Sequence, residues 1–274
     1  MARRLIGRVT VVALLSASSL AAAQAPSPSP EELGPLEDEP LDWWPWAVSA
    51  PLFGTALTID FAVDVPGARW RRVGPIDEGF LPWVRDTRAG RKRADRASDV
   101  FLYATIAAPV LDAVLWRAGA RPSRDTYRLL TADALAFATQ ALVTVVTKVG
   151  FRRARPYDEA CRGDPDDAPE CEGDNRFRSF VSGHSSASFT GAALVCAHQR
   201  MRGLSALGRV ECVASLLLAS LTGALRMVSE RHYFSDVIAG AAVGFFAGFV
   251  FPVFVYPRAL PRPAPPPARA QRAW

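Results

Sequence analysis

Five apolar segments separated by short polar breaks constrain the fold of this chain more than any other feature. Strand-like alternation of apolar and polar residues is almost absent, and segments of this length are typical of helices. Glycine, proline and arginine residues occupy the breaks, as expected of turns. The pattern predicts an all-α domain, a helical bundle with about five core helices. The segments cover residues 99–118, 126–149, 183–199, 207–228 and 234–256 of 274.

The polar residues inside these segments leave two interpretations of the bundle. Residues 237–256 carry no charge and are long enough to cross a bilayer. Asp112, Asp133 and Gln140 interrupt the first two segments. Such residues are costly inside a membrane span and are expected to face the bundle interior. A membrane-spanning bundle is therefore one interpretation, and a soluble bundle with a buried apolar core is the alternative.

The distribution of arginine favours the membrane-spanning interpretation. The breaks at residues 117–128 and 200–209 and the tail after residue 257 are all rich in arginine. If the helices alternate in direction, these regions share one face, which the positive-inside rule places in the cytoplasm. We therefore predict a protein of the cell (inner) membrane whose opposite face is directed to the periplasm or exterior. The alternative is a soluble periplasmic or secreted protein.

The first 23 residues have the composition of a secretory signal peptide. Three arginines precede a mixed apolar run, and three alanines at residues 21–23 fit a cleavage site. An uncleaved N-terminal anchor is the alternative interpretation of the same pattern. Both interpretations place the following residues outside the cytoplasm.

The expected domain organisation follows from changes in composition. The segment after the signal begins with a stretch rich in proline and acidic residues, typical of a disordered linker. An apolar stretch at 43–65 follows, which two aspartates make a poor membrane span, and then a basic stretch at 69–96 that suits a surface loop or attraction to anionic lipid. The expected units are residues 1–23 (signal), 24–98 (extracytoplasmic linker and N-terminal segment), 99–257 (helical domain) and 258–274 (tail rich in proline and arginine).

The four cysteines fall into two pairs of different surroundings. Cys161 and Cys171 lie in a short polar segment, where an oxidising compartment favours a local disulfide. Cys196 and Cys212 lie in apolar segments, where buried thiols are expected and a second bridge across a helical hairpin is the alternative. No cluster of cysteine and histidine has metal-ligand spacing, so no metal is expected.

Three short motifs place cationic side chains, histidines and a carboxylate at the ends of the predicted helices. An up-down bundle brings these ends to the same face, although they are far apart in the sequence. The net charge of +5 also favours an anionic partner, whereas the spacing and aromatic pattern of nucleic-acid-binding modules is missing. The motifs contain Lys148 and Arg155, then Ser182, Gly183 and His184, then Arg226, His232 and Asp236.

This combination of residue types suits phosphoryl transfer. Arginine and lysine supply fixed positive charge for a phosphate, and Gly183 lets a helix N-terminus approach it. His232 and Asp236 are four residues apart, so on a helix they share a face, where a carboxylate fixes the tautomer of an attacking imidazole. His184 can protonate the leaving oxygen and later activate water. The third histidine, His198, stands at the far end of its segment and is interpreted as a solvated helix end.

The three motifs resemble the signature of the type 2 phosphatidic acid phosphatase superfamily, K-x6-RP, then PSGH, then SR-x5-H-x3-D. The resemblance covers about residues 99–257, and the first motif is complete. Val181 stands where the family has proline, and Leu225 where the family has serine. The first change is expected to alter the loop before the helix, and the second removes a hydroxyl donor, but neither deletes a catalytic group.

The resemblance also implies a role for each site residue. His232 would form a phosphohistidine, Asp236 would orient it, and His184 would act as general acid and then as base. No metal or other cofactor is implied. The remaining residues would hold the phosphate oxygens: Lys148, Arg155, Ser182, Gly183 and Arg226.

The activity that the resemblance implies is that of a metal-independent phosphatase. Its substrates would be phosphate monoesters or diphosphates of lipids, and membrane lipids would surround it. Three alternatives are a soluble secreted acid phosphatase of the same superfamily, a vanadium-dependent haloperoxidase, which has a similar helical core and anion site, and a membrane scaffold with a relic anion site. The motifs specify neither the phosphorylated lipid nor the oligomeric state.

Overall fold

A computed structural model describes residues 43–84, 87–115, 124–163, 171, 173–201 and 205–255. Apart from one isolated bridge between Trp70 and Arg153, the regular secondary structure of these residues is helical, which confirms the predicted all-α class. The expected signal, most of the linker and the expected tail lie outside the described residues. The long helices are α2 (Trp44–Ala62), α4 (Arg88–Leu115), α5 (Arg124–Phe151), α7 (Gly183–Met201), α8 (Ala206–Val228) and α9 (Phe234–Val255).

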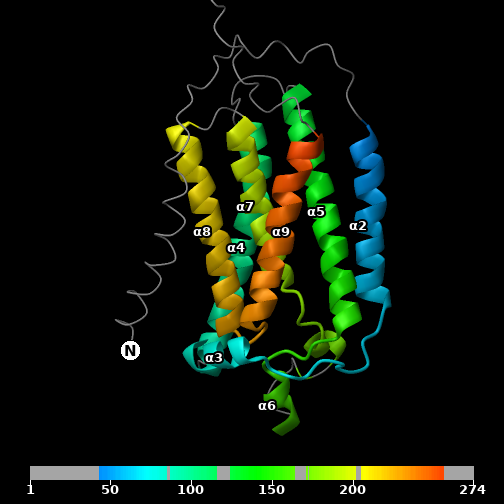
Figure 1. Ribbon diagram of the computed structural model, residues 1–274, viewed down its shortest axis with the longest axis vertical. Coiled ribbons are helices and arrows are strands. Elements are labelled where there is room, and N and C mark those ends of the chain that lie inside the picture. Colours follow the sequence, from blue (N-terminus) through cyan, green and yellow to red (C-terminus); the bar gives the residue numbers. More distant parts are fainter. Residues whose placement is uncertain are drawn as a thin grey trace, which may run out of the picture. The chain divides into compact units, whose positions relative to one another are not determined.

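Figure 1 shows these helices side by side, with α7 among the others and α2 on the outside of α5. The short helices α3 (Pro75–Val84) and α6 (Asp158–Gly163) lie at one end of the bundle, together with the loops that follow α5 and α8. We call this the site end, and the other the far end. A further short 3-10 helix, η5, covers Asp174–Phe177.

Three helices begin in regions that the sequence did not predict as helical. The apolar stretch at 43–65 forms α2, and Asp60 near its end pairs with Arg178 at 3.0 Å. The basic stretch at 69–96 forms α3 and the first turns of α4, so its interpretation as a loop is wrong for these parts. The first turns of α4 consist largely of alanine, arginine and lysine, which favour helix even without apolar periodicity.

Close packing of α7 and α9 depends on small residues. Gly240, Gly244 and Gly248 recur every four residues along α9, so they share a face. A Cβ atom on Gly244 would collide with the backbone of Ser186, and one on Gly248 would collide with that of Thr190. The absence of side chains therefore lets the two helices approach within backbone contact, as in the small-residue interfaces of membrane helices.

Four of the described helices are long and apolar enough to cross a membrane. Their outward faces carry large apolar side chains such as Leu111 (52% exposed), Leu217 (59%) and Phe246 (68%). Apolar surface of this extent is typical of contact with lipid or with another protein. The four candidate spans are Ala89–Leu115, Thr126–Phe151, Ala206–Val228 and Phe234–Pro252.

The far end contains a buried polar cluster that corrects two expectations. His198 is fully buried, not solvated, because its Nδ1 atom lies 2.9 Å from Asp112 and its Nε2 atom 3.0 Å from Asp133. Cys196 and Cys212 form a disulfide between α7 and α8, so the expectation of thiols is wrong and its alternative holds.

Candidate active site

The three motifs meet at the site end, where α5 ends and α7 and α9 begin. A Cβ atom added to Gly183 would lie 3.0 Å from Nζ of Lys148, which places the first two motifs together. The backbone N–H of Ser182 donates to the carbonyl of Asp236 at 3.0 Å, which joins the second and third motifs. Residues that are far apart in the sequence therefore form one site.

The imidazole of His232 is oriented by a backbone carbonyl. It is 2% exposed, and its Nδ1–H donates to the carbonyl oxygen of Ser179 at 2.8 Å. A carbonyl only accepts, so this bond fixes the tautomer and leaves a lone pair on Nε2. Nε2 makes no hydrogen bond with the described residues. His232 thus keeps one nitrogen unengaged, and Arg155, Arg226 and Lys148 lie close enough to act on it electrostatically.

Asp236 acts on His232 mainly through Ser179. Its nearer oxygen is 3.7 Å from Nδ1 of His232, which is an ion-pair distance but too long for a hydrogen bond. Instead it accepts hydrogen bonds from the Ser179 hydroxyl at 2.5 Å and from the Tyr233 N–H at 3.0 Å. The carboxylate therefore fixes the segment whose carbonyl holds the imidazole, and lies close enough to stabilise positive charge on it.

Arg153 is a buried member of the site that the motifs did not identify. It is 1% exposed and donates to Asp236 at 2.5 Å and to the Ser235 hydroxyl at 2.7 Å. Its guanidinium lies between the rings of Trp70 and Tyr233, 4.1 and 4.3 Å from their centroids. In the sequence Arg153 stands inside the unspecified positions of the first motif, beside other arginines, so nothing there distinguished it.

Asp77 of α3 is a second buried residue that sequence reasoning missed. It is 3% exposed and accepts from Arg153 at 2.6 Å. It also accepts from the backbone N–H and the hydroxyl of Ser235, both at 2.8 Å, at the start of α9. Asp77 therefore satisfies donors at the N-terminus of α9 and links α3, through Arg153, to Asp236.

Two aspartates of α4 bind the predicted site residues His184 and Arg226. A carboxylate oxygen of Asp99 lies 2.8 Å from Nε2 of His184, within hydrogen-bond distance. Asp95 accepts from Arg226 at 2.5 Å and from Arg231 at 2.9 Å. Both aspartates lie in the first three to four turns of α4, where no sequence pattern singles out an acidic residue.

The positive charges of the site exceed its nearby negative charges. Lys148 and Arg155 form no ion pair with the described residues, although Arg155 donates to the Asn175 side chain at 2.8 Å. The Nε atoms of Arg155 and Arg226 are buried without a hydrogen-bond partner in the described structure. Because unpaired buried donors are unfavourable, this arrangement fits a bound oxyanion that would accept from them.

Burial and these cations also set the protonation state of His232. Burial, followed by the charges of Arg155, Arg226 and Lys148, holds the pKa of His232 well below its ordinary value of 6.5. Burial likewise lowers the pKa of the Arg155 guanidinium. His232 is therefore neutral at physiological pH, which is the form able to attack phosphorus.

Ser182 and Gly183 form the start of α7 beside Lys148. The hydroxyl of Ser182 accepts from the Ser185 N–H at 3.3 Å and from its hydroxyl at 3.0 Å, which makes Ser182 the N-cap of the helix. The side chain of Ser182 is thus engaged in the cap. The first N–H groups and the positive end of the helix dipole favour an anion at this position. The preceding Phe180–Val181 peptide bond is cis.

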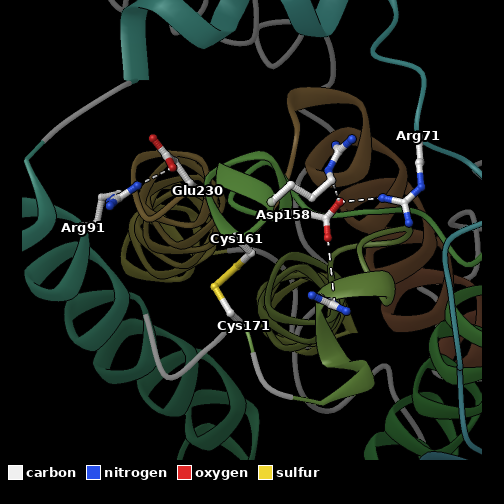
Figure 2. Close-up of a disulfide and its surroundings, with 8 residues drawn as sticks. Arg71, Arg91, Asp158, Cys161, Cys171 and Glu230 are labelled. Carbon is white, nitrogen blue, oxygen red and sulfur yellow. Dashed lines mark hydrogen bonds and ion pairs between the residues drawn. A yellow bond between two sulfur atoms is a disulfide. The ribbon is translucent and has the colours of Figure 1, made fainter. Parts of the chain in front are cut away.

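A disulfide joins the short helix α6 to Cys171. Cys161 and Cys171 are bonded, and with Tyr157 they form a small buried cluster. Figure 2 shows the disulfide close to Asp158, whose carboxylate pairs with Arg71 at 2.7 Å. Helix α6 is therefore tied to Cys171 by the disulfide and to the segment before α3 by the ion pair.

The part of the chain that contains the motifs matches a known family. The model of the PAP2 superfamily matches residues 130–259, from α5 through the end of α9. This match agrees with the resemblance found in the motifs.

Two curated proteins and one solved structure are similar to the chain. The lipid A 1-phosphatase of Porphyromonas gingivalis is 31% identical over 126 residues, which are 46% of this chain and 24% of that protein. A PA-phosphatase related-family protein of Dictyostelium discoideum is 32% identical over 143 residues, half of each chain. The chain thus spans a quarter to a half of these relatives. A transmembrane PAP2 type phosphatidylglycerolphosphate phosphatase from Bacillus subtilis is 20% identical, with a TM-score of 0.49, over 75% of this chain and 94% of its own.

Proposed function

We propose that this chain is an integral membrane phosphatase that hydrolyses phosphate monoesters or diphosphates of lipids without a metal, through a phosphohistidine at His232. The observation that carries the proposal is the free Nε2 of His232, in the electrostatic field of Arg155, Arg226 and Lys148, together with the unpaired buried Nε donors of Arg155 and Arg226. The match to the PAP2 superfamily model and the similarity to a lipid A 1-phosphatase support it. The candidate spans support a membrane location.

The proposed reaction has two steps that share one anion site. Lys148, Arg155, Arg226 and the start of α7 hold the phosphoryl oxygens. Nε2 of His232 donates its lone pair to phosphorus, the ester P–O bond breaks, and the leaving oxygen takes a proton from His184. The Nδ1–H of His232 stays hydrogen-bonded to the Ser179 carbonyl, so the ring of the phosphohistidine carries a positive charge. The carboxylate of Asp236, 3.7 Å from Nδ1, stabilises this charge.

Water completes the second step. Neutral His184 removes a proton from a water molecule, whose oxygen attacks phosphorus while the P–N bond to His232 breaks. Inorganic phosphate leaves, and both histidines return to their starting states. Asp99, 2.8 Å from His184, stabilises the protonated imidazole that is present before the first step and forms again in the second.

The direction of α2 bears on which membrane face holds the site. The rings of Trp46 and Tyr127 lie 6.4 Å apart at the start of α2 and α5, whereas Asp60 pairs with Arg178 near the site. The two helices therefore run in the same direction. If α2 lies in the membrane beside α5, residue 43 and the site face opposite sides. A site on the outer face then requires residue 43 to be in the cytoplasm. A cleaved signal peptide or a membrane-spanning anchor before α2 would instead place residue 43 outside the cytoplasm, so neither is compatible with an outer site.

We favour the outward site because the described helix ends that border the arginine-rich segments, those of α4, α7 and α9, lie at the far end, as the positive-inside rule requires. Reporter fusions active on only one side of the membrane, placed after residues 40 and 122, test this topology. These points precede α2 and α5 in the sequence, and both helices begin at the far end, so both fusions are expected to report the cytoplasm. A periplasmic signal from both would contradict the proposal and place the site in the cytoplasm.

A panel of lipid phosphates tests the activity itself. Purified protein in detergent is assayed for phosphate release from phosphatidic acid, phosphatidylglycerol phosphate, a polyprenyl diphosphate and lipid A, with and without a metal chelator. Release that the chelator leaves unchanged, together with acid-labile phosphate on His232 after rapid quenching, is expected. Peroxidase activity on addition of vanadate with no phosphate release would support the haloperoxidase alternative instead.

A further inference from the structure

We propose that α3 is an interfacial helix: the exposed stripe formed by Ile76, Phe80 and Trp83 lies in the boundary between lipid and water, while the adjacent face of the same helix holds the active site. The proposal rests on the membrane location given above. It extends the site to a part of the chain outside the family match, which begins at residue 130.

The stripe is a regular face of the helix. Ile76, Phe80 and Trp83 follow the i, i+4, i+7 spacing that aligns side chains along one side of a helix. They are 64%, 40% and 60% exposed. Glu78, on another side of α3, is also exposed, so the helix separates apolar and acidic surfaces. Three large apolar side chains facing water would be unfavourable, and a lipid surface removes them from it.

The helix is held firmly against the site. Asp77 follows Ile76 in the sequence but points inward, where it binds Arg153 at 2.6 Å and two donors of Ser235 at 2.8 Å. Phe80 stacks on Phe234, with ring centroids 4.0 Å apart and planes inclined by 11°. The exposed stripe therefore has a fixed position relative to His232, two residues before Phe234.

The stripe continues the apolar surface of a candidate span, which identifies lipid as its partner. Phe234 is the first residue of α9, and Ile238, one turn further along the same side, is 52% exposed. The apolar surface thus passes from α9 onto α3 at the end of the span. Tryptophan is favoured at this depth, where Trp83 lies. Lys92 and Arg93 in the first turns of the next helix, α4, are exposed and suit anionic headgroups.

An interfacial α3 would fix the depth of the site relative to the bilayer. A lipid phosphate diffusing within the membrane would then meet the cations of the site at the level of its headgroup, with its acyl chains still in the bilayer. The chemical class of the partner is therefore a phospholipid surface, and the stripe would matter for a substrate held in that surface more than for one dissolved in water.

Fluorescence quenching tests the position of α3 directly. Among the described residues all cysteines are in disulfides, so an introduced cysteine is the expected labelling site. Ile76→Cys and the matched control Glu78→Cys are labelled with a polarity-sensitive dye in lipid nanodiscs. Lipids carrying a nitroxide near the headgroup are expected to quench the dye at residue 76 several-fold more than at residue 78. Equal quenching at both positions, absence of quenching at 76, or cross-linking of Ile76→Cys between two copies would overturn the proposal.

A kinetic comparison tests its consequence. The double variant Ile76→Ser, Trp83→Ser is compared with the unaltered protein on a short-chain, water-soluble phosphate ester and on the same headgroup in vesicles. We expect the rate on the soluble ester to stay within about twofold, while the apparent KM on vesicles rises about tenfold. Equal effects on both substrates would overturn this consequence. Quenching without any phosphatase activity would leave α3 interfacial and contradict the proposed function alone.

Discussion

The two ends of the helical bundle each bury a histidine among charged residues, and they differ in what is left unpaired. At the far end, both nitrogens of His198 lie within 3.0 Å of carboxylates, those of Asp112 and Asp133. At the site end, His232 has one nitrogen on a backbone carbonyl and the other without a partner among the described residues. The same residue type is thus fully engaged at one end and half engaged at the other.

The charges around the two histidines follow the same division. The far end surrounds His198 with negative charge, which a protonated imidazole neutralises. The site end surrounds His232 with Lys148, Arg155 and Arg226, and the Nε donors of Arg155 and Arg226 are buried without a partner in the described structure. The far end thus pairs its imidazole with carboxylates, whereas the site end leaves donors that an anion could engage. The surroundings of the histidine, more than its presence, therefore distinguish the candidate site from the far cluster.

The largest expected effect is the loss of activity in His232→Asn. The asparagine amide can still donate to the Ser179 carbonyl, so the fold should persist, but no lone pair remains to attack phosphorus. We expect phosphate release to fall by at least about 10³-fold, as for other deleted nucleophiles, with an unchanged thermal midpoint. The test is phosphate release by the variant from the lipid on which the unaltered protein is most active. Activity near that of the unaltered protein would exclude His232 as the nucleophile.

His198→Leu is expected to have the opposite profile. It leaves the carboxylates of Asp112 and Asp133 buried and close together without the imidazole between them. Removal of one member of a buried charged cluster costs about 3–5 kcal/mol, so unfolding by dodecyl sulfate should occur at clearly lower concentration. The kcat of the protein that remains folded should not change. A large loss of kcat at unaltered stability would mean that the two ends are not functionally separate.

The helices and the motif residues could be predicted because their signals are local. Long apolar segments predicted α4, α5, α7, α8 and α9. The fixed spacing within the motifs predicted site residues such as His232 and Asp236. α2 was not included because Asp60 broke its apolar pattern, and the partner that neutralises Asp60, Arg178, is 118 residues away. The direct partner of the His232 imidazole, the Ser179 carbonyl, has no sequence signal, since every residue has such a group.

The missed and misplaced residues depend on contacts between distant elements. Arg153 and Asp77 lie 76 residues apart, and only the packing of α3 on α9 brings them together. His198 was interpreted as solvated because it stands beside Gln199 and Arg200. The relevant signal lay in other helices, where Asp112 and Asp133 interrupt apolar segments and therefore needed a buried partner.

A smaller effect is expected from Asp77→Asn, which weakens the support of the site without touching its anion-binding groups. The amide cannot accept at both positions from Arg153 and Ser235 as the carboxylate does. Asp236 and Ser179, and with them His232, should be held less firmly. We expect kcat to fall about tenfold, equivalent to about 1.4 kcal/mol, with little change in KM. Glu78→Gln, on the exposed side of the same helix, serves as the control and should leave kcat unaltered. A purely structural role would lower the thermal midpoint and leave the kcat of the folded fraction intact.

The smallest effect concerns the pH at which the site loses activity. Because burial and the neighbouring cations lower the pKa of His232, its neutral form persists below pH 6.5 and is lost only as pH falls through the lowered pKa. The acid limb of kcat/KM, which reports the free enzyme, should therefore lie below pH 6.5. Arg155→Gln removes one of these cations, so the pKa should rise and the limb should move upward by about one pH unit or less. Arg152→Gln, which replaces the guanidinium that donates to the Val149 carbonyl, is the matched control and should not move the limb. A limb that shifts equally in both variants would show that net charge, and not the unpaired cations around His232, sets the protonation of the nucleophile.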